Sequence, residues 1–178
     1  MRKVFPAPPM VAYRKQPSIR DKIIRAQVPD PPKREQRKKR GMKKCNKARC
    51  VTCSFVKPGS TVQSTKNNYK VDINVAADCE TENSVYLLEC AKCLDQYVGT
   101  TQHPIKERFK QHKGYVTQNL QDKATGFHFN QPGHSVSDMR ITIIEKVFSK
   151  DVILREQREQ YYINKFEAKS RGMNRKNG

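Results

Sequence analysis

The chain contains no tryptophan, few hydrophobic residues and no long apolar run. Only 35% of its 178 residues are hydrophobic, and no stretch reaches ten apolar residues. A membrane-spanning helix needs about 20 predominantly apolar residues, so the sequence offers no candidate for one. The first twenty residues mix five Lys or Arg residues with four prolines, unlike the apolar centre of a secretory signal peptide. We therefore expect neither secretion nor a membrane partner.

Acidic residues are scarce in the first part of the chain. Residues 1–50 carry 17 Lys or Arg and 3 Asp or Glu, against 19 and 14 in residues 51–178. Such a basic segment favours a polyanionic partner, most commonly nucleic acid, over a solvated arm or a membrane-surface arm. The block 33–44 is typical of a nuclear import signal, a phosphate-contacting segment or a solvated linker. We expect a DNA partner, RNA as a further partner of the tail, and a nuclear location.

Cysteine is absent beyond residue 93, and all six cysteines lie in one part of the chain. In a reducing compartment disulfides are disfavoured, and a Cys-x-x-Cys pair is more often a metal or redox motif. The spacing suits a tetrahedral zinc ion. Metal binding is therefore the first interpretation of the six residues: Cys45, Cys50, Cys53, Cys79, Cys90 and Cys93.

The order of expected elements predicts a small α/β domain. Residues 84–89 and 96–100 are β-branched and aromatic runs that predict an antiparallel hairpin, and 139–148 predicts a third strand. Pro104 suits the first turn of a helix, and a second helix is expected over 152–166, with Val152, Ile153, Tyr162, Ile163 and Phe166 as its apolar face. We divide the chain into a basic Pro-rich tail (1–44, largely disordered), a Cys-containing segment (45–81) and the small α/β domain (82–175).

Several polar residues of this domain have the chemistry that phosphodiester hydrolysis needs. The hairpin carries Tyr86 and Tyr97, and the following helix carries Arg108 and His112, four residues apart on one face. Glu159 lies on the last helix. A carboxylate can hold a divalent metal, a guanidinium can neutralise charge on phosphorus, and phenols or imidazole can orient water. From spacing alone, packed tyrosines and solvated charges would be the better interpretation.

The order of these motifs resembles the GIY-YIG nuclease superfamily over residues 82–175. The matching pieces are Val85-Tyr86, Tyr97-Val98-Gly99, Arg108-x-x-x-His112, Arg158-Glu159 and Gly172-Met173-Asn174, with Ser84 in place of the first glycine. The resemblance implies a three-stranded antiparallel sheet flanked by helices. It also implies that Tyr86 and Tyr97 line the water-activating side, Arg108 stabilises the scissile phosphate, and His112 assists proton transfer or positioning. Glu159 would ligate Mg²⁺ or Mn²⁺, and Asn174 would support the site.

Cysteines and histidines narrow the resemblance to the endonuclease domain of Penelope-like retroelements. Cys90 and Cys93 lie between the tyrosine motifs, and His128 and His134 follow; together they look like one structural zinc site that staples the domain. Upstream, Cys45, Cys50, Cys53 and Cys79 resemble the segment that precedes that domain, and form a second zinc site or remain free thiols. The 44 residues before Cys45 are too few for a polymerase palm domain. We therefore expect the chain to be the C-terminal part of such an element, or a gene fragment derived from one, and expect the reverse transcriptase as a partner.

The resemblance implies a metal-dependent DNA endonuclease that nicks one strand. The nick would provide the 3′-hydroxyl for target-primed reverse transcription. Two other functions stay open: a zinc-stabilised nucleic-acid-binding module that has lost cleavage, and a repair nuclease acting on branched DNA. The basic tail, the cysteine content and Ser84 motivate the inactive module.

Overall fold

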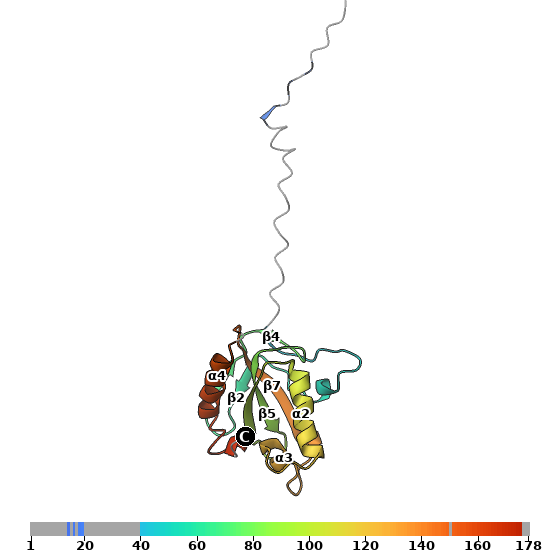
Figure 1. Cartoon of the computed structure of the whole chain (residues 1–178). Coiled ribbons are helices and arrows are strands. Elements are labelled where there is room, and N and C mark those ends of the chain that lie inside the picture. The colour runs from blue at the N-terminus through green and yellow to red at the C-terminus, as the bar shows by residue number, and fades with distance from the viewer. Residues whose placement is uncertain (1–13, 15, 17, 20–39, 150, 176–178) are drawn as a thin grey trace, which may run out of the picture. The chain divides into compact units, whose positions relative to one another are not determined.

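The computed structural model describes residues 14, 16, 18, 19, 40–149 and 151–175. The chain divides into one unit of residues 1–37 and one of residues 38–178, and the second contains the sheets and helices given below (Figure 1). The expected tail, 1–44, lies almost entirely outside the described residues. Within the described residues, no helix combines the length and apolarity needed to cross a membrane.

A three-stranded antiparallel sheet forms the centre of this unit. Strand β5 (Ser84–Cys90) lies between β6 (Gln96–Thr101) and β7 (Met139–Lys146). All seven residues of β5 are buried, which is expected for a central strand covered on both faces. The predicted hairpin and third strand are confirmed in place, and with them the small α/β fold with an antiparallel sheet.

The register of the hairpin brings the two motif tyrosines to one face. Tyr86 of β5 lies opposite Gly99 of β6, and Leu88 lies opposite Tyr97. Successive side chains of a strand alternate between faces, so Tyr86 and Leu88 share a face, and their partners across the hairpin share it with them. The spacing of the two motifs therefore sets the two phenols side by side.

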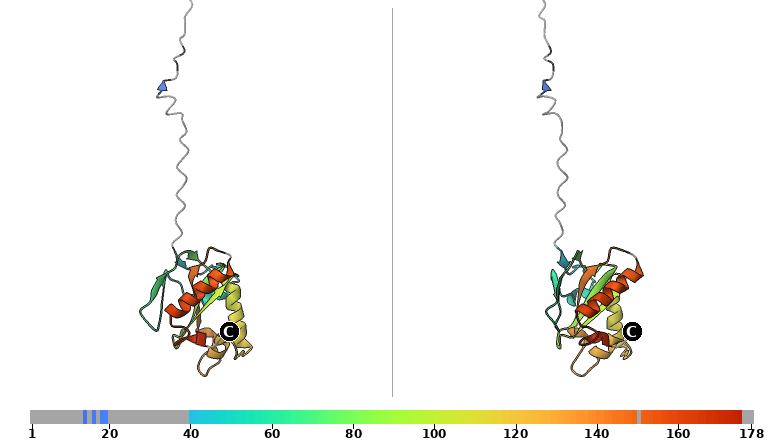
Figure 2. Two further views of the ribbon diagram at one scale, coloured as in Figure 1. Left: turned by 60° about the vertical axis from the view of Figure 1, so that its left-hand side comes forward. Right: turned by 90° about the vertical axis from the view of Figure 1, so that its left-hand side faces the viewer.

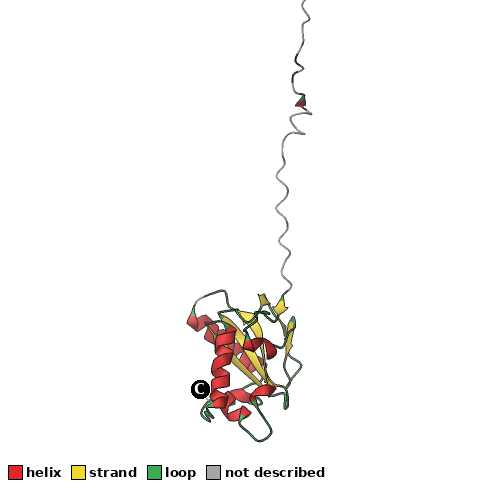
Figure 3. Cartoon of the chain, turned by 90° about the vertical axis from the view of Figure 1, so that its right-hand side faces the viewer, coloured by secondary structure: helices red, strands yellow, loops and turns green. Residues whose placement is uncertain are grey.

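Three helices accompany the sheet. Helix α2 (Ile105–Thr117) begins after Pro104, α3 (Ala124–Phe129) follows, and α4 (Val152–Lys165) begins at Asp151, whose carboxylate accepts a hydrogen bond from the Ile153 N–H. In Figure 1 the sheet lies between α4 on the left and α2 on the right. Figure 2 shows α4 crossing in front of the strands, and Figure 3 shows the helices gathered beside them.

The expected apolar face of the last helix is partly wrong. Val152 and Ile153 are 49% and 64% exposed, whereas Tyr162 and Phe166 are buried as expected. The buried residue in the first turns is instead Arg155, which is 4% exposed and donates hydrogen bonds to Asn83 and Gln102. A guanidinium with these partners replaces apolar packing at the start of α4, where hydrophobic periodicity misplaced the buried face.

Residues 40–81 pack onto the same core as the catalytic domain. Strand β1 (Gly41–Met42) pairs with β4 (Ala76–Ala77), and β2 (Thr61–Gln63) pairs with β3 (Lys70–Asp72). Val56 bridges to Ile141 of β7. Short 3₁₀ turns cover Val51–Ser54, Val136–Asp138 and Met173–Arg175. The Cys-containing segment and the nuclease-like segment therefore share one hydrophobic core.

Candidate active site and metal centres

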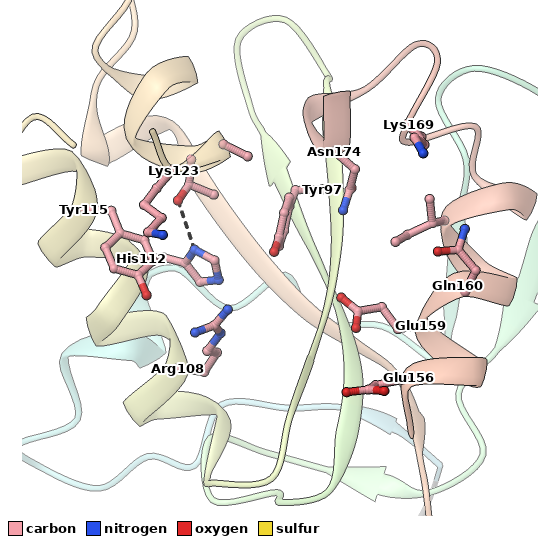
Figure 4. Close-up of a pocket in the computed structure, with 13 residues that line it drawn as sticks. Tyr97, Arg108, His112, Tyr115, Lys123, Glu156, Glu159, Gln160, Lys169 and Asn174 are labelled. Carbon is pink, nitrogen blue, oxygen red and sulfur yellow. Dashed lines mark hydrogen bonds between the residues drawn. The ribbon is translucent and has the colours of Figure 1, made fainter. Parts of the chain in front are cut away.

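A cleft of about 620 Å³ opens between α2 and α4 beside strand β6. Arg108, His112 and Tyr115 line it from α2, and Glu156 and Glu159 from α4; Figure 4 shows these two walls facing each other, with Tyr97 and Asn174 between them. The remaining lining residues come from α3, α4 and the C-terminal segment: Lys123, Ala124, Thr125, Gln160, Ile163 and Lys169. One wall thus carries cations and the other carboxylates, which suits a metal-bridged phosphate.

Tyr86 lies behind the cleft, where it joins Arg108 to His112. The Arg108 Nε–H donates to the Tyr86 hydroxyl oxygen over 3.0 Å, and that hydroxyl is 2.7 Å from His112 Nε2. Tyr86 is fully buried and is not among the lining residues, whereas Tyr97 lines the cleft. Burial raises the pKa of both phenols, so both stay protonated at neutral pH. Of the two tyrosines expected on the water-activating side, Tyr97 lines the cleft and Tyr86 is buried behind it.

His112 is a buried, neutral imidazole. Burial, helped by the positive charge of Arg108, lowers its pKa to about 3. Its ring packs edge-on against Tyr86, Tyr97 and Tyr115, and its Nδ1 lies 3.0 Å from the Thr125 hydroxyl. Both ring nitrogens therefore have partners within the protein. This geometry favours the positioning role over direct proton transfer.

Gly99 is required because the two phenols pack against its backbone. A Cβ at this position would lie 2.5 Å from the Tyr86 hydroxyl oxygen and 2.8 Å from a ring carbon of Tyr97. Only glycine leaves room for both rings, whose centroids are 6.4 Å apart. The glycine of the second motif thus acts by close approach, not by an unusual backbone angle.

Asn174 holds the outer edge of strand β6. Its side-chain oxygen accepts from the Val98 N–H over 2.8 Å, and its amide donates to the Val98 carbonyl over 2.7 Å. Strand β6 is an edge strand of the sheet, so these bonds occupy backbone groups that would otherwise lack a partner. Because Val98 separates Tyr97 from Gly99, Asn174 fixes the strand at the point where the cleft begins.

Glu159 is the candidate ligand for a divalent cation. Its half-buried carboxylate lines the cleft; burial raises its pKa, and the positive charge of Arg108 opposes that shift. A second carboxylate, Glu156, lies one turn earlier on α4 and lines the same cleft. Oxygen donors of this kind are what Mg²⁺ and Mn²⁺ prefer, so the residues present fit such an ion.

A second group of ligands joins the β5–β6 turn to α3. The ligand atoms of Cys90, Cys93, His128 and His134 all lie within 4.8 Å of one another, and Cys93 Sγ is 3.4 Å from His128 Nε2. Among the described residues, both ring nitrogens of His134 are buried without a hydrogen-bond partner. Buried polar atoms are normally satisfied, so this ring indicates a missing ligand. The set fits tetrahedral zinc.

The upstream cysteines form a third group despite their distance in sequence. Cys45 Sγ lies 3.4 Å from Cys53 Sγ, which lies 3.7 Å from Cys79 Sγ; with Cys50 all four sulfurs are within 4.8 Å. No disulfide joins them. Tetrahedral coordination with Zn–S distances of about 2.3 Å separates sulfurs by about 3.8 Å, close to what is observed. The structure thus brings together both proposed zinc sets.

Sequence reasoning missed several residues of the cleft. Thr125, Lys123 and Lys169 have no motif of their own and reach the cleft only through the packing of α3 and the C-terminal segment. Glu156 was visible as a neighbour of Glu159 on the same helix face, three residues earlier. That spacing was the available signal for a second carboxylate.

The fold and cleft define a class of protein: a nuclease, which hydrolyses phosphodiester bonds. The family model for the GIY-YIG catalytic domain matches residues 82–174, just over half of the chain, and the chain belongs to this family. Nucleases of this family generally depend on a divalent metal, and their substrate is DNA. Comparison with curated proteins and with solved structures finds no match.

Proposed function

We propose that this chain is a metal-dependent DNA endonuclease that cuts one strand of a duplex. The arrangement of opposite charges across one cleft carries the proposal: Arg108 faces Glu159 from the other wall, with Tyr97 between them. Arg108 is suited to bind the scissile phosphate. Burial works to lower the pKa of its guanidinium, but the neighbouring tyrosines, Tyr86 foremost, together raise the pKa, so Arg108 stays charged.

Each side chain has a distinct part in this proposal. Arg108 neutralises charge that develops on the phosphate, while Tyr97, supported by the buried Tyr86 and His112, orients the attacking water. Glu159 holds the cation, with Glu156 within the same cleft; the bound ion would supply Lewis-acid stabilisation of the phosphate. Asn174 supports the strand that carries Tyr97.

A supercoiled-plasmid assay tests this function. We expect relaxed circles with Mg²⁺ or Mn²⁺ and none with EDTA. Removal of one electrostatic partner costs roughly 10²–10³ in rate, so Glu159→Gln and Arg108→Ala should bind DNA but nick at least a hundredfold more slowly. Glu107→Gln, an exposed carboxylate on α2, is the matched control and should nick normally. Normal nicking by Glu159→Gln would contradict the assignment.

The second candidate is a nucleic-acid-binding module without cleavage. The basic first fifty residues favour it. Its binding should weaken steeply with salt because each neutralised phosphate releases counterions. Intact plasmid with every metal, together with tight binding, would identify the module; a preference for junction DNA over plasmid would indicate the repair nuclease instead.

We further propose that the chain derives from a Penelope-like retroelement and acts in the nucleus beside a reverse transcriptase. The Cys90, Cys93, His128 and His134 set between and after the tyrosine motifs supports this origin. Priming requires a nick that ends in a 3′-hydroxyl. A DNA polymerase should therefore extend the nicked product directly, and a requirement for prior phosphatase treatment would contradict the priming role.

We also propose that both ligand groups hold structural zinc. Elemental analysis of protein purified without chelator should give about two zinc ions per chain. A content of about one ion supports only the Cys90, Cys93, His128 and His134 site, and in that case Cys45, Cys50, Cys53 and Cys79 are free thiols. A zinc content of none contradicts both sites.

A further inference from the structure

Helix α3 presents a hydroxyl to the nitrogen of His112 that faces away from Tyr86. Thr125 is 1% exposed and His112 is 2% exposed, so no water competes for this contact. The hydroxyl oxygen is 3.0 Å from His112 Nδ1, the hydrogen bond drawn as a dashed line in Figure 4. The nuclease motifs do not include Thr125.

Hydrogen-bond donors along this line determine where each proton lies. Arg108 can only donate hydrogen bonds, so its Nε–H donates one to the Tyr86 hydroxyl oxygen. The single Tyr86 proton then points to the lone pair of His112 Nε2, 2.7 Å away. A neutral imidazole carries one N–H, and with Nε2 accepting, that N–H is on Nδ1 and points to Thr125.

We propose that Thr125 is a positioning residue that accepts the Nδ1–H of His112 and so stabilises the tautomer that Arg108 and Tyr86 select. This tautomer leaves the Nε2 lone pair for Tyr86, directs the Tyr86 proton away from Arg108, and so holds the guanidinium toward the cleft. The relay runs from Arg108 through Tyr86 and His112 to Thr125. Its effect on cleavage rests on the proposed endonuclease function, whereas the tautomer itself does not.

The position of Thr125 is itself tightly fixed by its neighbours on α3. Gly126 has no room for a Cβ beside the carbonyl oxygens of Leu120 and Tyr115, so α3 packs closely against the end of α2. The Asn130 amide donates to the carbonyls of Val116 and Gly126. These contacts leave the hydroxyl little freedom to move away from His112.

The charged and titratable groups facing His112 are few. From α2 they are Arg108 and Tyr115, and from the hairpin Tyr86 and Tyr97; Lys123, at the start of α3, lines the same cleft. None of them offers a carboxylate to the imidazole among these contacts. The Thr125 hydroxyl is neutral, so it accepts the Nδ1–H without raising the basicity of the ring as a carboxylate would.

Nitrogen-15 spectroscopy of the full chain tests the tautomer directly. Two-bond ¹H–¹⁵N spectra of histidine-labelled protein, assigned by the signals lost in His112→Gln, should show the proton on Nδ1 and an unprotonated Nε2. A wild-type His112 protonated on Nε2 would overturn the proposal, whatever the fate of any variant. Thr125→Val should lose the single-tautomer pattern, and Thr125→Ser should keep it.

Plasmid nicking tests the consequence for the reaction. Outer-shell partners of this kind typically contribute about 10- to 100-fold, so Thr125→Val should lower kcat by that factor with KM for plasmid unchanged, and Thr125→Ser should restore it. Thr117→Val, an exposed hydroxyl bonded to carbonyls of its own helix, is the matched control. If the wild type is active and Thr125→Val has an unchanged kcat, the proposal is overturned. If the wild type is inactive but His112 has the expected tautomer, the result counts only against the nuclease function.

Discussion

Acid should destabilise the folded chain through His112. An unfolded histidine has a pKa near 6.5, and burial in the fold lowers it to about 3. Between these values the unfolded state binds a proton that the folded state does not, so stability falls as pH falls through this window. Each pH unit well inside it costs about 1.4 kcal/mol, and the change from pH 7 to pH 5 amounts to about 2 kcal/mol.

Urea unfolding at pH 7 and pH 5 measures this loss. The wild type should lose about 2 kcal/mol more than His112→Gln over the interval, because glutamine has no proton to gain on unfolding. Protonation of the other histidines and of the metal ligands is common to both proteins and cancels in the difference. His103→Gln, at an exposed position, should keep the full wild-type loss. Equal losses in wild type and His112→Gln would refute the reasoning.

Three further substitutions have expected outcomes. Gly99→Ala should lower the melting temperature and reduce nicking by at least a hundredfold, since its Cβ would overlap the Tyr86 hydroxyl; normal melting and nicking would refute the close approach. Ser84→Ala should leave nicking unchanged and stabilise by about 1 kcal/mol in urea unfolding, because it removes a buried hydroxyl that has no partner among the described residues; destabilisation would show that the hydroxyl is used. His134→Ala should lose one zinc ion in elemental analysis and lower the melting temperature; an unchanged zinc content would exclude His134 as a ligand.

The sequence predicted the elements whose patterns are local. The β-branched and aromatic runs at 84–89 and 96–100 predicted the hairpin, and the four-residue spacing of Arg108 and His112 predicted their shared helix face. Both predictions use a pattern within a short stretch of sequence, which does not depend on the rest of the fold. Local patterns cannot predict which distant elements come together. The family resemblance predicted that these elements meet around one cleft.

Residues whose role depends on tertiary packing were beyond this reasoning. Thr125 reaches His112 only because Gly126 lets α3 pack against the end of α2. Arg155 is buried because loop residues satisfy its guanidinium, which no helical pattern encodes. The strands of residues 41–77 are two or three residues long, too short for an alternation signal.

The two glycine positions of the tyrosine motifs are under different physical demands, and this difference bears on activity. Position 99 lies opposite Tyr86 in the register, where the phenols occupy the space a side chain would need. Ser84 lies at the far end of the hairpin opposite Thr101, where it is fully buried. Serine at position 84 therefore leaves the β5–β6 register, the two phenols and the contacts of Arg108 in place. Serine instead of the first motif glycine is thus a poor reason to infer loss of cleavage.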